Sequence, residues 1–480
     1  MFQKGEYEEA ATIYREWVAA EPGSGAAHAG FARSLLFAGR PREATRALAA
    51  ALQAAPNAAA VQVAVGDVAF YQAAFGQAEA AYTTAIQKDP KLTAAWLGLI
   101  RISQLASAHQ SAERLLNQAL ENDPANRSLL SYKASLYPND SRHLAALEKI
   151  LASYEPDSEQ AKELQAHIEW DKTKGVEKRR ILVSLYQPAQ IPIEPIRDRP
   201  PVRTLIEQPS GRMTQLVRDS PIVAWGVRVR VNEKRPLMLI LETGVSGITV
   251  NSKAAVGFDL VRESRQDHKL GGIGGGTQIT TRRELARMVE IGGVVFENFP
   301  IEVLEEGGLR ADGLIGTDVF AQFLVTVDLG RLKLRLTPFP GMKTAPDPDE
   351  LVQRRPSEAA AGFISFYRKD YLILLPTIVN DKGPFLFVIS TGSLPTVVTP
   401  EVVAELGEVK NYYGRINATL EFAGLRQKKG AMPEIAVAGD MARLSGPAGP
   451  RIGGKLGADT LFRLPFTIDY RNGLIKFGKH

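Results

Sequence analysis

The first third of the chain has a fixed internal period, and this period constrains the fold more than any other feature. Four prolines lie 34 residues apart: Pro22, Pro56, Pro90 and Pro124. An alanine stands twelve residues before each of them: Ala10, Ala44, Ala78 and Ala112. Because proline cannot continue a helix, each one marks a helix end. The pattern therefore predicts an array of paired helices, each pair closed by a proline.

Two further positions in each repeat are apolar or small, as expected for one buried helix face. They lie five and eight residues before the prolines: Trp17, Ala51, Ala85 and Ala119, and Tyr14, Leu48, Tyr82 and Leu116. The period, the alanines and the terminal proline resemble the tetratricopeptide repeat family, over about residues 1–155 with a weaker copy through Pro156. The resemblance implies a scaffold that binds a peptide or a partner protein. Packing of the array against a neighbouring domain is the alternative.

The beginning of the chain bears on localisation. Met1 falls where the first helix of the first repeat should end, so an upstream segment is expected to be missing. The opening residues, MFQKGEYEEA, are polar and acidic, unlike a signal peptide. No run approaches the roughly 18 apolar residues of a membrane helix. As it stands the chain is predicted to be soluble and cytoplasmic, with no membrane span, or periplasmic or secreted if a signal peptide precedes it.

Composition excludes several classes of site. The chain has 480 residues, 45% of them hydrophobic, which is enough for more than one core. It has no cysteine, so disulfides, thiolate metal sites and cysteine nucleophiles are excluded. The net charge of +5 is concentrated in a proline-rich stretch between Asp171 and Arg218, which is predicted to be a solvated linker or edge structure. A charge excess this mild does not indicate a nucleic-acid partner.

The carboxy-terminal part of the chain is an internal duplication. The stretch VNEKRPLMLILETG, from Val231, corresponds to VNDKGPFLFVISTG, from Val379. Further on, ADGLIGTDVF corresponds to GGKLGADTLF. Each copy alternates short β-branched runs with glycine and polar turns, which predicts two all-β lobes of about 120 residues.

The strand, the acid-Thr-Gly turn and the later apolar-apolar-Gly segment resemble the aspartic peptidases, over roughly Pro221 to Phe477. The lobe length is closer to the retroviral type than to the pepsin type. The resemblance implies two turns that meet at a pseudo-twofold axis: Glu242, Thr243 and Gly244 in the first lobe and Ser390, Thr391 and Gly392 in the second. It also implies a flap, a mobile β-hairpin over bound peptide, at Gly271, Gly272, Ile273, Gly274, Gly275 and Gly276.

The predicted fold class is therefore multidomain, with all-α tetratricopeptide helical repeats followed by an all-β double lobe like that of the acid proteases. Five segments are expected: helical repeats at 1–170, a basic proline-rich linker at 171–218, the first lobe at 219–340, a connector at 341–361 and the second lobe at 362–480.

Both acid positions of the family motif are substituted. Two aspartates that share one proton supply a base and an acid, whereas a serine at position 390 does not ionise near neutral pH. At position 242 the extra methylene of glutamate moves the carboxylate by about 1.5 Å. A displacement near 1 Å costs about 100-fold in rate, and loss of a second acid or base costs about 10²–10⁴. The sequence thus favours a degenerate, non-catalytic pair.

Three functions stay open at this point. The first is a pseudo-peptidase that holds a peptide or protein segment in its bilobal cleft by strand addition. The second is an active aspartic-type endopeptidase in which Glu242 is a general base acting through water that Ser390 orients. The third is a protein-interaction scaffold that uses the repeats alone, in which Thr243 and Thr391 only brace the two turns.

Other chemistries lack their motifs. The run GGIGGG does not satisfy GxGxxG, since Thr277 takes the place of the last glycine. The six histidines form no HxxxH pair, and no GxSxG is present. We therefore predict no cofactor and no metal. Two pairs of aspartates occupy matching places in the lobes and are predicted to be structural: Asp318 and Asp459, and Asp328 and Asp469.

Overall fold

The protein is described here as a computed structural model. Its described residues are 6–136, 141–174, 179–198, 202–207, 213–218, 220–262, 268–270, 279–305, 311–347, 362–369, 371–408, 414–427, 435–437, 441, 444, 446 and 449–478. They divide into two compact units. The helical unit is Met1–Lys178 with Leu351–Arg355 and Ser445–Arg451, and the β unit is Arg179–Glu350, Pro356–Leu444 and Ile452–His480.

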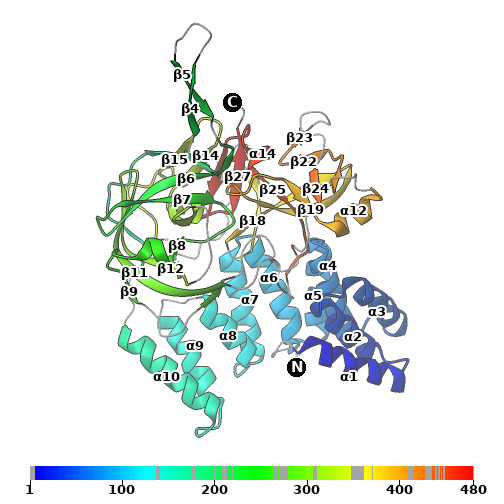
Figure 1. The fold of residues 1–480 in the computed structure, drawn as a ribbon. Helices are drawn as coiled ribbons and strands as arrows, with labels where there is room; N and C mark the ends of the chain where they lie inside the picture. Colours follow the sequence, from blue (N-terminus) through cyan, green and yellow to red (C-terminus); the bar gives the residue numbers. More distant parts are fainter. Residues whose placement is uncertain are drawn as a thin grey trace. The chain divides into compact units, whose positions relative to one another are not determined.

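The helical unit consists of helices stacked in pairs (Figure 1). Their bounds are α1 Tyr7–Ala20, α2 Gly25–Phe37, α3 Pro41–Ala54, α4 Ala59–Tyr71, α5 Phe75–Lys88, α6 Thr93–Leu105, α7 His109–Asn122, α8 Arg127–Leu136, α9 Ser141–Leu151 and α10 Glu159–Lys174. Helices α1, α3, α5 and α7 each end two residues before one of the periodic prolines. The predicted helical repeat is confirmed.

Small residues allow the repeats to pack closely. The alanines that stand twelve residues before the periodic prolines are at most 1% exposed. The ring of Tyr82 on α5 lies between Gly66 on α4 and Gly98 on α6, where an added Cβ would come within 2.4 Å of the ring. Trp17 departs from the pattern, since its side chain is 41% exposed.

A buried charge network links successive repeats. Asp67 is 2% exposed and accepts hydrogen bonds from the Tyr82 hydroxyl at 2.7 Å and from Arg33 Nε at 2.6 Å. Arg101 also donates to it, at 3.2 Å. Arg33 and Arg101 stand 34 residues before and after Asp67, so the repeat period itself aligns the three charges. A buried carboxylate needs such partners, because an unpaired buried charge is costly.

The β unit contains one sheet for each lobe. The sheet of the first lobe runs β1-β12-β8-β13-β7-β6-β11-β10, with β3 paired to β6 and β9 to β11. Its strands are β1 Ile181–Leu182, β3 Glu194–Arg197, β6 Ile222–Val231, β7 Pro236–Glu242, β8 Ile248–Asn251, β9 Val261–Arg262, β10 His268–Leu270, β11 Ile279–Ile291, β12 Val294–Leu304 and β13 Gly313–Gly316.

The sheet of the second lobe repeats this plan. It runs β21-β24-β20-β25-β19-β18-β22-β23, with β17 paired to β18. Its strands are β17 Tyr367–Lys369, β18 Leu372–Val379, β19 Lys382–Ile389, β20 Val397–Val398, β21 Arg415–Ile416, β22 Leu420–Phe422, β23 Leu425–Gln427, β24 Ile435–Val437 and β25 Ile452–Leu456. The short helices of the two lobes are α11 Ser252–Ala255, η2 Thr317–Phe320, α12 Pro400–Leu406 and α14 Ala458–Leu461.

A third sheet joins the lobes. It runs β16-β27-β26-β14-β15-β2, with β2 Ala189–Pro192, β14 Leu324–Asp328, β15 Lys333–Thr337, β16 Ile364–Ser365, β26 Phe466–Asp469 and β27 Leu474–Phe477. Strand β14 of the first lobe pairs with β26 of the second, and the hydroxyls of Thr326 and Thr467 lie 2.8 Å apart across this junction. Buried apolar residues of both lobes form one continuous core. The predicted all-β double lobe is confirmed.

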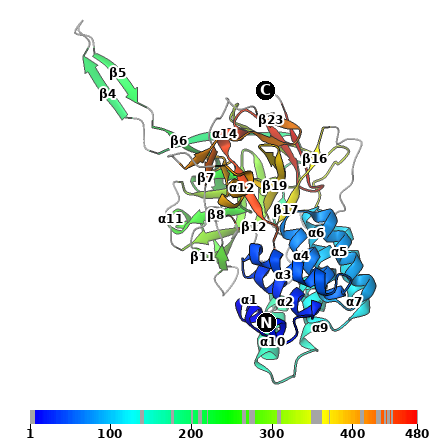
Figure 2. The same ribbon diagram turned by 90° about the vertical axis from the view of Figure 1, so that its right-hand side faces the viewer.

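Part of the predicted linker at 171–218 is regular structure. Strand β2 pairs with β15, and β3 pairs with β6, although each contains a proline. Both are edge strands, where a residue without a backbone N–H is tolerated. In the same stretch β4, Val202–Glu207, and β5, Met213–Arg218, form a hairpin (Figure 2). The proline-rich composition therefore marks sheet edges here as well as a connection.

Candidate functional site

The two acid positions are presented by equivalent hairpins. The turn between β6 and β7 places Asn232 and Glu233 at positive φ, and the turn between β18 and β19 does the same with Asn380 and Asp381. Two successive positive φ values define the type I′ turn, which suits the twist of paired strands. The side-chain oxygen of each asparagine accepts a backbone N–H, from Met288 in one lobe and Thr419 in the other. The duplicated Val-Asn motif therefore has one structural role in both lobes.

A strand threaded behind each turn holds it in place. Strand β13, which carries LIG, runs parallel to β7 and antiparallel to β8, and its Gly316 is in register with Glu242. Strand β25, which ends with the Lys and Leu of KLG, runs parallel to β19 and antiparallel to β20. The same strand arrangement occurs twice, so positions 242 and 390 emerge from equivalent frameworks.

The two threonines brace the turns across the lobe boundary. The Thr243 hydroxyl donates to the carbonyl of Ile389 at 2.7 Å, and the Thr391 hydroxyl donates to the carbonyl of Leu241 at 2.8 Å. The backbone N–H of Thr243 also donates to Thr391 Oγ1, at 3.1 Å. Both side chains are at most 1% exposed. Each lobe thus supplies a hydroxyl that satisfies a buried backbone carbonyl of the other.

Glu242 and Ser390 lie together, and the glutamate takes donors from both turns. Glu242 Oε1 accepts from the N–H of Gly244 at 2.7 Å. Glu242 Oε2 accepts from the Ser390 hydroxyl at 2.8 Å and from the N–H of Gly392 at 3.1 Å. The extra methylene, which sequence reasoning treated only as a displacement, lets one carboxylate reach the turn of the opposite lobe.

Burial and polar contacts act on the charge of Glu242 in opposite directions. The side chain is 7% exposed, and this burial raises the pKa of Glu242 above its usual value. The donated hydrogen bonds and the positive charge of Lys455 act the other way and only partly offset that rise. The second carboxylate that raises the pKa of an aspartate in the family is thus replaced here by desolvation.

Lys455 is a site residue that sequence reasoning missed. It lies on β25, is 8% exposed, and donates to the hydroxyl of Ser393. Burial lowers its pKa, while the charges of Glu242 and Asp459 act to raise it. The available signal was a charged residue at the first apolar place of KLG, where the other copy has Leu314.

The paired aspartates stabilise the turns that follow the acid positions. Asp318 accepts from the Ser246 hydroxyl at 2.7 Å and from the N–H of Gly247 at 2.9 Å. Asp459 accepts from the N–H of Thr396 at 3.0 Å and from its hydroxyl at 2.6 Å. These carboxylates are occupied by local donors, which agrees with a structural role.

Asp328 and Asp469 have a similar role at the closing strands. Each accepts a backbone N–H three residues further on, from Arg331 and Asn472 respectively, at 2.9 Å. The predicted flap, Gly271 to Gly276, lies outside the described residues.

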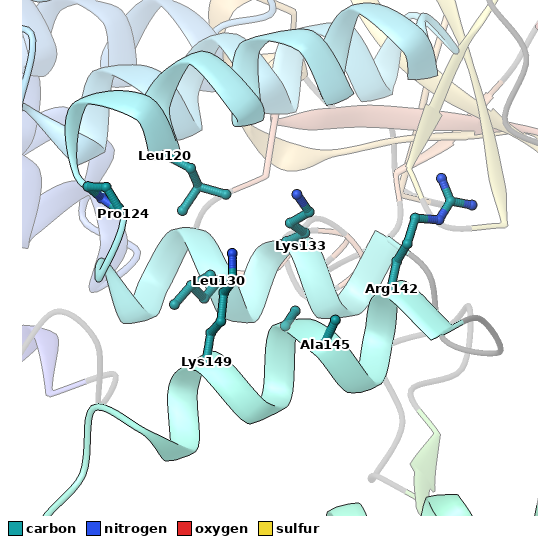
Figure 3. A pocket seen from close by; sticks show the side chains of 8 residues that line it. Leu120, Pro124, Leu130, Lys133, Arg142, Ala145 and Lys149 are labelled. Carbon is teal, nitrogen blue, oxygen red and sulfur yellow. The ribbon is translucent and has the colours of Figure 1, made fainter.

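The helical unit has a hollow of about 230 Å³ among α7, α8 and α9 (Figure 3). Its lining combines apolar and cationic side chains: Leu120, Pro124, Leu130, Lys133, Arg142, Ala145, Ala146 and Lys149. Lys133 donates to Asn117 at 3.1 Å, and Arg142 lies 3.7 Å from Glu113. The hollow therefore offers an apolar floor edged by positive charge.

Comparisons with known proteins find a similar segment in each part of the chain. A family model described as tetratricopeptide repeat matches residues 1–65, and one described as aspartyl protease matches residues 227–319. Among solved structures, the crystal structure of an aspartic proteinase from Irpex lacteus is similar at 10% sequence identity and a TM-score of 0.39, covering 61% of this chain and 97% of that chain. A search of curated protein sequences gives no match. Tetratricopeptide repeats thus precede an aspartyl protease-like domain.

Within the part of the chain that the structure describes, no helix combines the length and the apolar character that crossing a membrane requires.

Proposed function

We propose that the β unit holds an extended peptide segment without hydrolysing it, while the helical unit binds a partner protein. The observation that carries the proposal is the hydrogen bonding of Glu242, whose two oxygens accept from Gly244, Ser390 and Gly392. A carboxylate offers about four acceptor sites. Three are used, two of them by donors of the opposite turn, so the residue that would be the base is committed to holding the lobes together.

The partners of Glu242 do not supply the missing acid. Peptide hydrolysis by this fold needs one group that takes a proton from water and another that gives one to the carbonyl oxygen. Ser390 already donates its proton to Glu242, and its hydroxyl is fully buried. The nearby charged group is Lys455, so the centre contains an opposite-charge pair in place of two equal carboxyls that share a proton.

Peptide binding remains compatible with this centre. Strand addition depends on backbone hydrogen bonds and side-chain pockets and does not need a dyad. The cross-braced threonines and the shared sheet would hold the two lobes as one rigid frame for such a segment.

One observation favours a working endopeptidase as the second candidate. A buried carboxyl with a raised pKa is what a general base near neutral pH needs, and Glu242 has both properties. In that case Glu242 would activate a water and the Lys455 ammonium would be the proton donor.

A peptide library separates these functions. The purified chain is incubated with mixed peptides between pH 3 and pH 8, and bound and cleaved peptides are identified by mass spectrometry. Retention without cleavage supports the proposal. Cleavage that disappears in Glu242→Ala but persists in Glu194→Ala, an exposed carboxylate paired with Arg228, establishes the endopeptidase. If peptides neither bind nor are cut, the scaffold function that uses the repeats alone is favoured.

A gain-of-function variant tests the rest of the centre. Glu242→Asp combined with Ser390→Asp restores two carboxyls across the lobe boundary. Cleavage by this variant, but not by the natural chain, would mean that the pair at 242 and 390 alone prevents hydrolysis.

For the helical unit, the charge of the hollow supports an acidic segment of the partner protein as its ligand. The same library should return acidic peptides with apolar anchors. Reversing the charge at Lys133 and Lys149 together should remove them, whereas Lys88→Glu, at the end of α5, should not. Equal retention by both variants would contradict this part of the proposal.

A further inference from the structure

Two histidines and an aspartate converge at the end of the repeat array. His143 lies on α9, and His167 and Asp171 lie on α10. The last two are four residues apart, so they share one face of the helix. His143 faces them from the neighbouring helix, and one ligand atom from each residue lies within 4.8 Å of the other two.

Both imidazoles direct a nitrogen at the same carboxylate oxygen. His143 Nε2 lies 3.4 Å from Asp171 Oδ2, and His167 Nε2 lies 3.3 Å from it. Metal–ligand bonds of about 2.0–2.1 Å at the tetrahedral angle place neighbouring ligand atoms about 3.3–3.4 Å apart. Two edges of a tetrahedral site are therefore already set. The third edge joins the two histidine nitrogens, which are no more than 4.8 Å apart. Bringing them to the tetrahedral spacing requires a shift of at most about 1.5 Å.

The orientation of His143 strengthens this interpretation. Its Nδ1 lies 3.0 Å from the carbonyl oxygen of Ala134. A carbonyl oxygen only accepts, so Nδ1 carries the proton and the neutral ring has a bare Nε2 directed at Asp171. Metal-ligating histidines commonly have their other nitrogen fixed in this way. The bare Nε2 of His143 faces a carboxylate oxygen, which repels it unless a proton or a cation lies between them.

The exposure of the three side chains suits an ion that enters from solvent. His143 and Asp171 are only 18% and 27% exposed, so packing holds their side chains in place. His167 is 55% exposed, so its ring can move. We propose that these residues bind one Zn²⁺-type divalent transition metal ion, which clips α9 to α10 and leaves a fourth position for water. Ligands of two imidazoles and one carboxylate suit zinc, whereas calcium and magnesium prefer oxygen ligands.

The sequence contained only half of this signal. His167 and Asp171 form an HxxxD pair, which a search for HxxxH passes over, and His143 stands 24 residues earlier on another helix. Only the packing of α9 against α10 brings the third ligand into place.

Cobalt binding tests the proposal in the full chain, purified without a polyhistidine tag and treated with a chelator. Co²⁺ should bind with one ion per chain and give the visible absorption of a tetrahedral site, which Zn²⁺ then abolishes. His143→Ala, His167→Ala and Asp171→Asn should each weaken binding at least about tenfold. His28→Ala removes an imidazole that contacts the carbonyl of Pro22 and should have no effect.

A second measurement distinguishes the loss of metal binding from the loss of folding in a variant. His167 is the most exposed of the three, so His167→Ala should keep the helical circular dichroism of the natural chain. Zn²⁺ should raise the thermal unfolding midpoint of the natural chain and of His28→Ala but not of His167→Ala. Absence of the cobalt spectrum, or equal affinity in natural and variant chains, would overturn the proposal and leave a histidine–aspartate ion pair only.

Discussion

The two lobes of the β unit share a framework and differ in what they contribute to its centre. Each has a type I′ hairpin, a parallel strand behind the turn, a threonine that bonds across the boundary, and an aspartate that holds the following turn. The first lobe supplies the carboxylate of Glu242. The second supplies the Ser390 hydroxyl, the Gly392 N–H and the charge of Lys455. The lobes are thus complementary where an acid pair would make them equivalent.

This difference separates the groups that hold the fold from the groups that would do chemistry. The threonine brace and the threaded strands are retained in both lobes, because they satisfy buried backbone groups that any sequence on this framework must satisfy. The acid positions are free to diverge as long as their buried polar atoms find partners. Glu242 and Ser390 meet that condition by bonding to each other.

The largest expected effect comes from removing the threonine hydroxyls that join the lobes, and the two threonines should differ in how much stability their loss costs. Thr391→Val leaves two buried partners unpaired, the carbonyl of Leu241 and the N–H of Thr243, whereas Thr243→Val leaves only the carbonyl of Ile389. At about 1–3 kcal/mol for each unsatisfied group, the free energy of unfolding should fall by about 2–6 kcal/mol in the first variant and about 1–3 kcal/mol in the second.

Urea unfolding measures this difference. Trp225, in the β unit, is the reporter in a background whose other tryptophans are phenylalanine. Thr84→Val, at a partly exposed position on α5 in the helical unit, should leave the transition unchanged. An equal loss in the two brace variants, or a larger one in Thr243→Val, would contradict the asymmetry.

Ser390→Ala should have the next largest effect. It removes a buried hydrogen bond to a carboxylate, which is worth about 1.5–3 kcal/mol. Because that bond favours the ionised form, its loss should also raise the pKa of Glu242 further, as measured by carboxyl NMR titration. Ser246→Ala, which loses a partly buried bond to Asp318, should cost less, since water can replace the hydroxyl there. A smaller cost at Ser390 than at Ser246 would count against the central pair.

Gly392→Ala tests the close approach of the carboxylate to the second turn. An added Cβ would meet Glu242 Oε2 at 2.8 Å and Ile240 Cγ2 at 2.9 Å. Such overpacking costs about 1–3 kcal/mol and should displace the carboxylate from its donors. Gly76 on α5 has open space at the same position, so Gly76→Ala is the control that should not destabilise the chain. An unchanged unfolding free energy in Gly392→Ala would mean that Glu242 does not reach across.

The smallest expected effect is a dependence on pH. Burial raises the pKa of Glu242 above 4.5, so the folded state binds this proton more tightly than the unfolded state does. The resulting stability is present below about pH 4.5 and is lost as the pH rises through the pKa of the folded state, by at most about 1.4 kcal/mol per pH unit. Glu242→Gln has no carboxyl at this position, so its stability does not show this loss as the pH rises. The difference in unfolding free energy between the two chains should therefore change with pH, and a constant difference would refute the assignment.

Much of the helical unit was predictable because helix formation is periodic and local. The 34-residue spacing placed the helix ends within two residues of each proline, since a proline cannot continue the helix that precedes it. The exposure of Trp17 was not predictable, because it depends on which neighbouring surface covers that position. The convergence of His143 with His167 depends in the same way on how two helices pack.

The duplicated motifs likewise predicted two β lobes and pointed to positions 242 and 390. The individual edge strands β2 and β3 were not predicted, because each contains a proline. By itself the sequence determined the repeat, the duplication and the substitution of both acids, because spacing and residue identity are properties of the chain. Only the tertiary structure decided that one glutamate accepts from both turns and that Lys455 lies near it, because reach, desolvation and charge pairing depend on distances between residues about 150 or more positions apart.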